Sequence, residues 1–113
     1  MRAPEISEIE ELRNLLRGNA IKRIVLKKDS ECSVGYIEYR DRVFEILFSR
    51  GDFADVYIAK ILYRPSEYIS CEYLVYNPYG LFVFSKDLRE LAEKIVAKLE
   101  HAYRYSERIS GEV

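Results

Sequence analysis

The sequence predicts one α+β domain, in which an antiparallel meander of five or six strands is covered on one face by an N-terminal helix and a long C-terminal helix. Three observations predict this class. Apolar residues recur with helical spacing near both ends of the chain, runs rich in β-branched and aromatic residues fill the middle, and the segments between those runs are short enough to require antiparallel neighbours. The 113 residues are expected to form a single domain, ordered over about 4–108 with a frayed tail at 109–113.

Two amphipathic helices are expected, over residues 4–17 and about 86–107. Pro4 suits the first turn of the first helix and Gly18 a left-handed stop after it, while Ser85 is a suitable N-cap for the second helix. Each helix has one apolar stripe. The stripes consist of Ile6, Ile9, Leu12, Leu15 and Leu16 in the first helix and of Leu88, Leu91, Ala92, Ile95, Val96, Leu99, Ala102 and Tyr103 in the second.

Six runs of β-branched and aromatic residues are predicted as strands, at 21–28, 33–39, 42–49, 55–63, 68–76 and 81–84. Turn signals separate them. The segment RPSE at 64–67 is expected to close a hairpin between the fourth and fifth runs, with Tyr63 opposite Tyr68. The segment NPYG at 77–80 has Asn first, Pro second and Gly fourth, which is typical of a type I turn, and it is expected to join the fifth run to the sixth.

Counting along the chain through these turns assigns the strand side chains to two faces. The face expected to pack against both helices carries Ile37, Tyr39, Phe44, Ile46, Phe48, Val56, Ile58, Lys60, Leu62, Ile69, Cys71, Tyr73, Val75, Phe82 and Phe84. The face expected to lie open carries Val34, Tyr36, Val43, Leu47, Tyr57, Ile61, Tyr63, Tyr68, Leu74, Tyr76, Leu81 and Val83, with Glu38, Glu45 and Glu72 among them. Because this open face is too apolar for the surface of a monomer, it predicts a partner, and the simplest is a second copy in a homo-oligomer, a dimer or higher.

Composition disfavours some functional classes and indicates a habitat. The formal net charge of −1 and the isoelectric point of about 5.9 do not indicate a globally basic nucleic-acid binder. No apolar run approaches the roughly 18 residues of a membrane span, and the N-terminal segment lacks the apolar region of a signal peptide, so a cytoplasmic protein without membrane contact is expected. Gln, Thr and Trp are absent while Glu, Lys, Arg, Ile and Tyr are abundant, which is typical of a hyperthermophile, archaeal-like protein.

No residue pattern indicates catalysis, a cofactor or a metal, and the protein is expected not to be an enzyme. His101 is the only histidine, it falls off the apolar stripe of the last helix, and no serine stands near it in a nucleophile motif. The carboxylates of the strands are better explained as isolated residues on a wet rim than as an acid and base pair. Cys32 and Cys71 lack metal-ligand spacing. The two cysteines either form a disulfide or are two buried free thiols, and the free thiols are favoured.

The tyrosine-rich open face is the strongest functional signal in the sequence. Tyrosine rings form stacking platforms for unpaired bases, and basic residues at the turns are placed to neutralise phosphates. The sequence therefore predicts a protein that binds single-stranded nucleic acid, either DNA or RNA. The residues expected to bind are Tyr57, Tyr63, Tyr68, Tyr76, Arg40, Arg42, Arg50, Arg64 and Lys60.

Two alternatives remain open. In the first, the same tyrosines fill the interface of a protein-interaction or assembly module, since Tyr is enriched in such interfaces. In the second, the charges of the segment IKRIVLKK, which are Lys22, Arg23, Lys27 and Lys28, do not bind nucleic acid. They are instead the solvated charges of an edge strand, which prevent it from pairing with another sheet.

The order of helix, antiparallel meander and long helix resembles that of archaeal ThermoDBP-related single-strand-binding proteins and, more loosely, of Whirly-type domains. The segment SKDLRELAEKIVAKLE at 85–100 resembles the last helix of a double-stranded-RNA-binding domain. That family has three strands and lysines at the start of this helix, where this chain has Asp87 and Glu90. The resemblance is one of architecture, and it implies an α+β fold.

Overall fold

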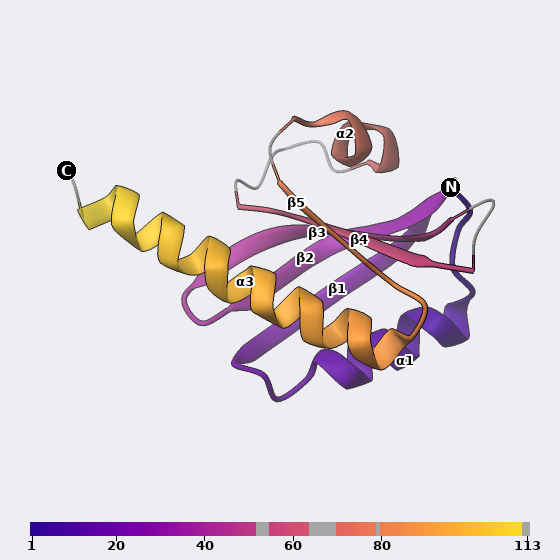
Figure 1. Ribbon diagram of the computed structural model, residues 1–113, viewed down its shortest axis with the longest axis horizontal. Coiled ribbons are helices and arrows are strands. Elements are labelled where there is room, and N and C mark those ends of the chain that lie inside the picture. The colour runs from indigo at the N-terminus through magenta and orange to yellow at the C-terminus, as the bar shows by residue number, and fades with distance from the viewer. Residues whose placement is uncertain (52–54, 64–69, 79, 112–113) are drawn as a thin grey trace.

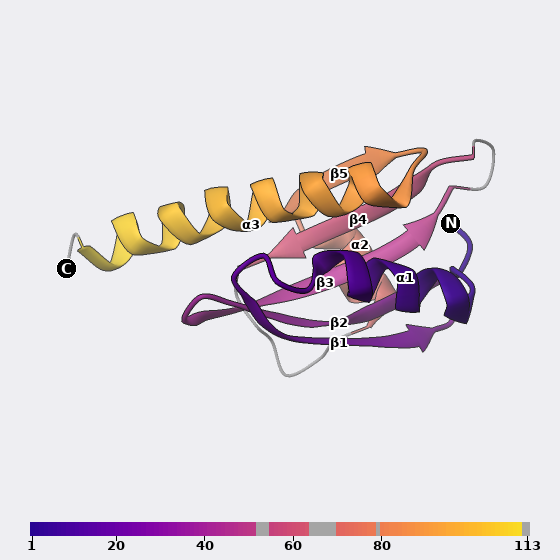
Figure 2. The same cartoon turned by 90° about the horizontal axis from the view of Figure 1, so that it is seen from below.

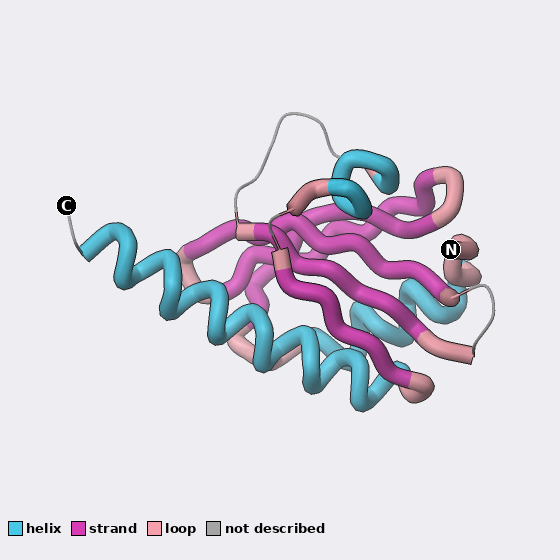
Figure 3. The backbone as a smooth tube through the Cα atoms, turned by 45° about the horizontal axis from the view of Figure 1, so that its top comes forward, coloured by secondary structure: helices cyan, strands magenta, loops and turns pink. Residues whose placement is uncertain are grey.

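A single antiparallel sheet forms the centre of the structure, a computed structural model that describes residues 1–51, 55–63, 70–78 and 80–111. Within these residues its five strands lie in chain order, β1 Ile21–Asp29, β2 Cys32–Tyr39, β3 Arg42–Arg50, β4 Tyr57–Leu62 and β5 Leu81–Ser85. The described helices are α1 Ile6–Leu16, α2 Cys71–Tyr76 and α3 Leu88–Gly111. The helices α1 and α3 lie side by side on one face (Figures 1 and 2), and α2 lies on the other (Figure 3). The α+β class predicted from the sequence is confirmed.

Local side-chain contacts set where the two long helices begin. Glu5 and Glu8 form a reciprocal capping box at the start of α1, in which the Glu5 N–H donates to Glu8 Oε1 at 2.9 Å. At the start of α3 the N–H of Glu90 donates to the Asp87 carboxylate at 3.3 Å. Asp87 therefore takes the capping role expected of Ser85, and α3 begins at Leu88 rather than at residue 86. Most of the two predicted apolar stripes is buried, at Ile9, Leu12, Leu16, Leu88, Leu91, Ala92, Ile95, Leu99 and Ala102. Ile6, predicted on the first stripe, is 65% exposed at the start of α1.

The strand predicted at 68–76 is wrong. Cys71–Tyr76 forms the helix α2, and β4 pairs with β5, with Tyr57 opposite Ser85, instead of with the run at 68–76. The run YISCEYLVY alternates like a strand, but Cys71 and Leu74 also have helical spacing. In a run this short both periods fit, and packing of the helix on the sheet decides between them.

The predicted faces of the sheet are wrong beyond β3. Phe48 lies opposite Ala59, so Ile61 faces α1 and α3, while Lys60 faces α2. The prediction assigns Lys60 to the helix-covered face and Ile61 to the open face. An error of one residue in the β3–β4 connection explains this, because it exchanges the face of every later side chain. Residues that face α1 and α3, contrary to prediction, are Tyr57, Ile61, Tyr63, Leu81 and Val83. Residues that face the other way, contrary to prediction, are Ile58, Lys60, Leu62, Phe82 and Phe84.

Each face of the sheet has its own apolar cluster. The larger cluster lies under α1 and α3 and includes Leu12, Ile37, Phe44, Ile46, Phe48, Leu91 and Ile95. The smaller one lies under α2 and contains Cys32, Val34, Leu47, Leu62, Cys71 and Leu74. A disulfide joins Cys32 to Cys71 across 39 residues of sequence, with Cα atoms 5.8 Å apart. The prediction of two free thiols is therefore wrong, and the disulfide links β2 to α2. Among the described residues, no helix is long and apolar enough to span a membrane.

Candidate nucleic-acid interface

Two of the tyrosines expected on an open face lie under the helices instead. The Tyr63 ring packs against Phe44, with centroids 5.8 Å apart, and the Tyr57 ring lies 5.9 Å from that of Phe48. The Tyr57 hydroxyl donates to Glu8 Oε2 at 2.5 Å. That hydrogen bond, together with burial, raises the pKa of Tyr57 to about 12. Both tyrosines therefore act in the packing of the helix-covered face.

The other two predicted tyrosines do not join them. Tyr76 is the last residue of α2, on the opposite side of the sheet, and 78% of it is exposed. Tyr68 and Arg64 lie outside the described residues. The structure thus brings Tyr57 and Tyr63 to one face and Tyr76 to the other, and they form no common stacking platform.

The predicted arginines are held in contacts within the chain. The Arg50 guanidinium lies 3.0 Å from Asp55 and 3.6 Å from Glu8. Arg40 lies 3.1 Å from Glu100 and packs beside the rings of Tyr39 and Tyr103. Arg42, at the start of β3, lies 3.9 Å from Asp41. The contacts with Glu8 and Glu100 tie a strand end and a turn to α1 and α3.

Lys60 is buried under α2, with 1% of the residue exposed. Its ammonium donates to the carbonyl oxygens of Leu74 at 2.7 Å and of Asn77, at the C-terminal end of α2. It also lies 4.7 Å from the centroid of the Phe82 ring. Burial lowers the pKa of Lys60. The side chain stabilises the negative end of a short helix, and this explains the only lysine on an otherwise apolar patch of β4.

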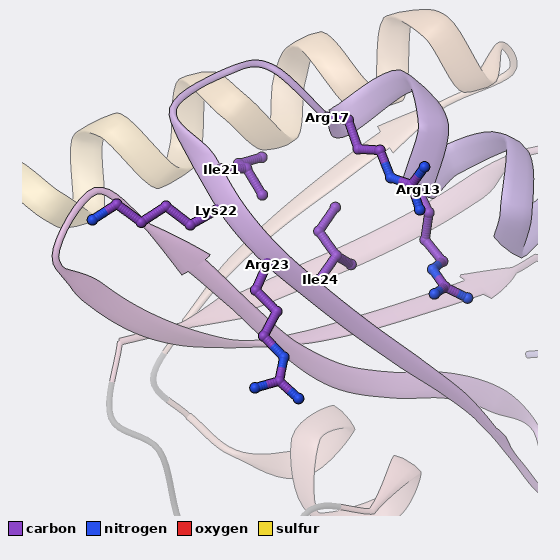
Figure 4. A pocket seen from close by; sticks show the side chains of 6 residues that line it. All are labelled: Arg13, Arg17, Ile21, Lys22, Arg23 and Ile24. Atoms are coloured by element: carbon purple, nitrogen blue, oxygen red, sulfur yellow. The ribbon is translucent and has the colours of Figure 1, made fainter.

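A different group of basic residues is free of such contacts. The last turn of α1 and the residue after it contribute Arg13 and Arg17, and the edge strand β1 contributes Lys22 and Arg23. These four line a hollow of about 280 Å³ together with Ile21 and Ile24 (Figure 4). Two more exposed lysines continue the row along β1. We call these six residues the basic edge: Arg13, Arg17, Lys22, Arg23, Lys27 and Lys28.

The basic edge is electrostatically unpaired. Within the part of the chain that the structure describes, none of its six side chains makes a hydrogen bond or an ion pair, whereas Arg40 and Arg50 each contact a carboxylate. Two carboxylates lie on or beside β1: that of Glu38 lies opposite Arg23 on β2, and that of Asp29 accepts a hydrogen bond from the Cys71 N–H at 2.8 Å. Because the whole chain has a net charge of −1, positive charge is concentrated on this edge of an otherwise acidic surface.

The sequence contained part of this site. The lysines and arginine of β1 are visible in the segment IKRIVLKK, which the sequence predicts only as support for a tyrosine-based site. Arg13 and Arg17 are not among the predicted binding residues, although their spacing of four residues places them on one side of α1. What the sequence does not reveal is that α1 ends beside β1, which brings the two groups together.

The arrangement offers several positive charges to an extended polyanion. Among the described residues, no three His, Cys, Asp or Glu side chains are grouped to hold a metal ion. Arg and Lys side chains on a strand and an adjacent helix end offer several positive charges along a line, and Arg adds planar donors for phosphate oxygens. Comparison with protein families, with curated proteins and with solved structures gave no match to this chain.

Proposed function

We propose that this protein is a non-enzymatic module that binds single-stranded nucleic acid, with the phosphates lying on the basic edge. One observation carries the proposal: six cationic side chains are gathered on one edge of an acidic protein and have no partner among the residues that the structure describes. Unpaired surface cations in a row are what phosphate binding requires, because each phosphate neutralised releases a counterion. The proposed contact surface is therefore the β1 edge, in place of the tyrosine hairpin expected from the sequence.

The dimensions of β1 fit this ligand. The strand runs from Ile21 to Asp29, and at about 3.3 Å per residue this gives an edge of roughly 26 Å. Sites of about 4–16 nucleotides are typical of single-strand binders. Basic residues lie near both ends of β1 and beside its first half, so a strand that follows the edge meets positive charge near each end.

Fluorescence anisotropy with a labelled oligonucleotide tests the proposal. The double variant Arg17→Gln/Arg23→Gln removes two exposed charges from the basic edge. The matched control Lys86→Gln/Arg89→Gln removes two exposed charges near the start of α3. We expect the first variant to bind severalfold more weakly at about 50 mM salt and the control to bind like the wild type. Equal weakening by both variants, or no binding by the wild type at tens of micromolar protein, overturns the proposal.

A second candidate function is a homo-oligomeric assembly module, and the exposed aromatic residues of β5 favour it. Phe82 and Phe84 are 42% and 52% exposed, and their rings stack with centroids 6.0 Å apart. Exposed aromatic pairs are enriched at protein interfaces. Light scattering tests this: an oligomer should dissociate in Phe82→Ser/Phe84→Ser but not in Tyr105→Ser, whose residue is 58% exposed on α3. A wild type that is monomeric at all concentrations contradicts it.

Both functions are compatible, because β1 and β5 are the opposite edges of the sheet.

We also propose, from composition, that the protein is cytoplasmic and comes from a hyperthermophile, archaeal-like source. Ion pairs that link three charges, as in Glu8, Arg50 and Asp55, support this proposal. A melting temperature above about 90 °C is expected, and one typical of mesophile domains, at about 45–65 °C, contradicts it.

A further inference from the structure

A second hollow of about 280 Å³ lies at the other half of β1, beside the basic edge. Its lining includes Val25, Lys27, Lys28 and Asp29 from β1 and Val34 and Tyr36 from β2. We call it the Tyr36 hollow. In the β1–β2 pairing Val25 lies opposite Tyr36, and Lys27 lies opposite Val34, so these four side chains share the face that carries α2.

This part of the sheet face lies beyond the short helix. The helix α2 packs on β2, β3 and β4, and its cluster takes in Val34 but neither Val25 nor Tyr36. Tyr36 and Val25 are half-buried. The Tyr36 side chain makes no hydrogen bond or ring contact with another described residue. An aromatic ring therefore stands partly open between an apolar wall and Lys27.

The chemistry of the Tyr36 hollow matches one flat, polar-edged ring. The tyrosine and valine side chains offer an apolar and aromatic surface on which a ring can stack. Lys27 offers a donor, and Asp29 offers an acceptor, because only its Oδ2 is used by the Cys71 N–H. Pockets that enclose drug-sized ligands have volumes of about 300–1,000 Å³, so a hollow of this size suits a single ring system.

We infer that the Tyr36 hollow binds one unpaired nucleobase, stacked on Tyr36, from the strand whose phosphates lie on the basic edge. The inference rests on the proposed function and specifies its ligand: a duplex keeps its bases stacked and paired, so only a single strand presents a base here. The Asp29 carboxylate accepts hydrogen bonds and repels phosphate. Bases that carry an exocyclic amino group, such as cytosine and adenine, are therefore preferred over thymine or uracil.

The test compares two strands and three proteins. One labelled oligonucleotide is cytosine throughout, and the other has the same sugar-phosphate backbone with abasic sites in place of the bases. The proteins are the wild type, Tyr36→Leu and Tyr36→Phe, each with its fold checked by circular dichroism. We expect Tyr36→Leu to bind the cytosine strand about 5- to 100-fold more weakly and the abasic strand like the wild type, whereas Tyr36→Phe, which keeps a ring, retains most of the affinity.

The outcomes separate the two proposals. If the wild type binds cytosine and abasic strands equally and Arg17→Gln/Arg23→Gln weakens both, the base site is overturned and phosphate binding on the basic edge stands. If Tyr36→Leu weakens both strands by the same factor, the base site is also overturned. If neither strand binds the wild type, both proposals fail. A thymine strand that binds as tightly as the cytosine strand overturns the role of Asp29.

Discussion

Single residues in this protein divide into those that are used by the fold and those that are left unpaired. Tyrosines and arginines that looked functional in the sequence are committed to intramolecular contacts, as for Tyr57 with Glu8 and Arg40 with Glu100. Lys22 and Arg23 on β1 have no such contact with any residue that the structure describes. Residue type alone indicates which side chains are able to bind a base or a phosphate, but only the three-dimensional contacts show which of them are available.

Tyr57→Phe tests one committed residue. The hydrogen bond to Glu8, with burial, raises the pKa of Tyr57 from 10.0 to about 12. Because the pKa in the folded state lies above that of the unfolded chain, this contribution to stability is complete below about pH 10 and is lost as the pH rises through about 12. We expect Tyr57→Phe to reduce the free energy of unfolding by about 1–3 kcal/mol near neutral pH. Urea denaturation at neutral pH and again at alkaline pH measures this, and the gap between the two proteins should narrow at high pH. A gap that does not depend on pH contradicts the assignment.

Gly35→Ala tests the closest approach between β1 and β2. A Cβ atom on Gly35 would lie 1.6 Å from the carbonyl oxygen of Val25, which is backbone and has no flexible end to move. We expect this substitution to lower the free energy of unfolding by about 3 kcal/mol or more, since the strand pairing itself must shift. Gly18→Ala is the control. It has open space for a Cβ atom but a φ of +86°, so a loss of about 1–2 kcal/mol is expected. Thermal denaturation measures both variants, and an equal loss of unfolding free energy in the two would falsify this account.

Elements were predictable where local sequence and packing agree. The helices α1 and α3 and the strands β1 to β3 follow their predicted positions within a few residues, because their caps, turns and apolar periods all indicate the same structure. Prediction failed at the segment 68–76, where strand and helix periods both fit, and at the β3–β4 connection, where one residue of register reversed the faces. Short elements and loop lengths are decided by long-range packing, which a single sequence does not display.

The position of α2 on the sheet depends on contacts at both of its ends. The Cys32–Cys71 disulfide and the hydrogen bond from the Cys71 N–H to Asp29 hold its first residue, and Lys60 holds the carbonyls at its end. A helix as short as α2 has little stability of its own without these contacts. When the disulfide is reduced, α2 is therefore expected to unfold locally before the sheet does.

Reduction of the disulfide is thus a prediction at the scale of the element. Closing a loop across 39 residues stabilises the folded chain by about 2–4 kcal/mol. We expect dithiothreitol to lower the melting temperature of the wild type and to increase hydrogen exchange in α2 more than in β2 or β3. The double variant Cys32→Ala/Cys71→Ala is the control, because its melting temperature should be low from the start and should not change with reductant. A wild-type melting temperature that reductant leaves unchanged contradicts the prediction.

At the scale of the whole molecule, the distribution of charge matters more than its sum. The net charge of −1 gives no sign of a polyanion ligand. The fold nevertheless places an edge strand with four basic residues next to a helix end with two more. The candidate site is therefore a property of the tertiary structure, and only its β1 half was readable in the sequence.

The salt dependence of oligonucleotide binding tests the central claim most directly. If all six side chains of the basic edge neutralise phosphates, the logarithm of the association constant should fall linearly with the logarithm of salt concentration, with a slope of about −4, because each contact on a single strand contributes about −0.7. Anisotropy titrations of the wild type between about 50 and 200 mM salt measure the slope. A slope near −4 that becomes shallower by about 1.4 in Arg17→Gln/Arg23→Gln is the predicted result. A slope near zero, or one that this variant leaves unchanged, contradicts the assignment of the basic edge as the phosphate-binding surface.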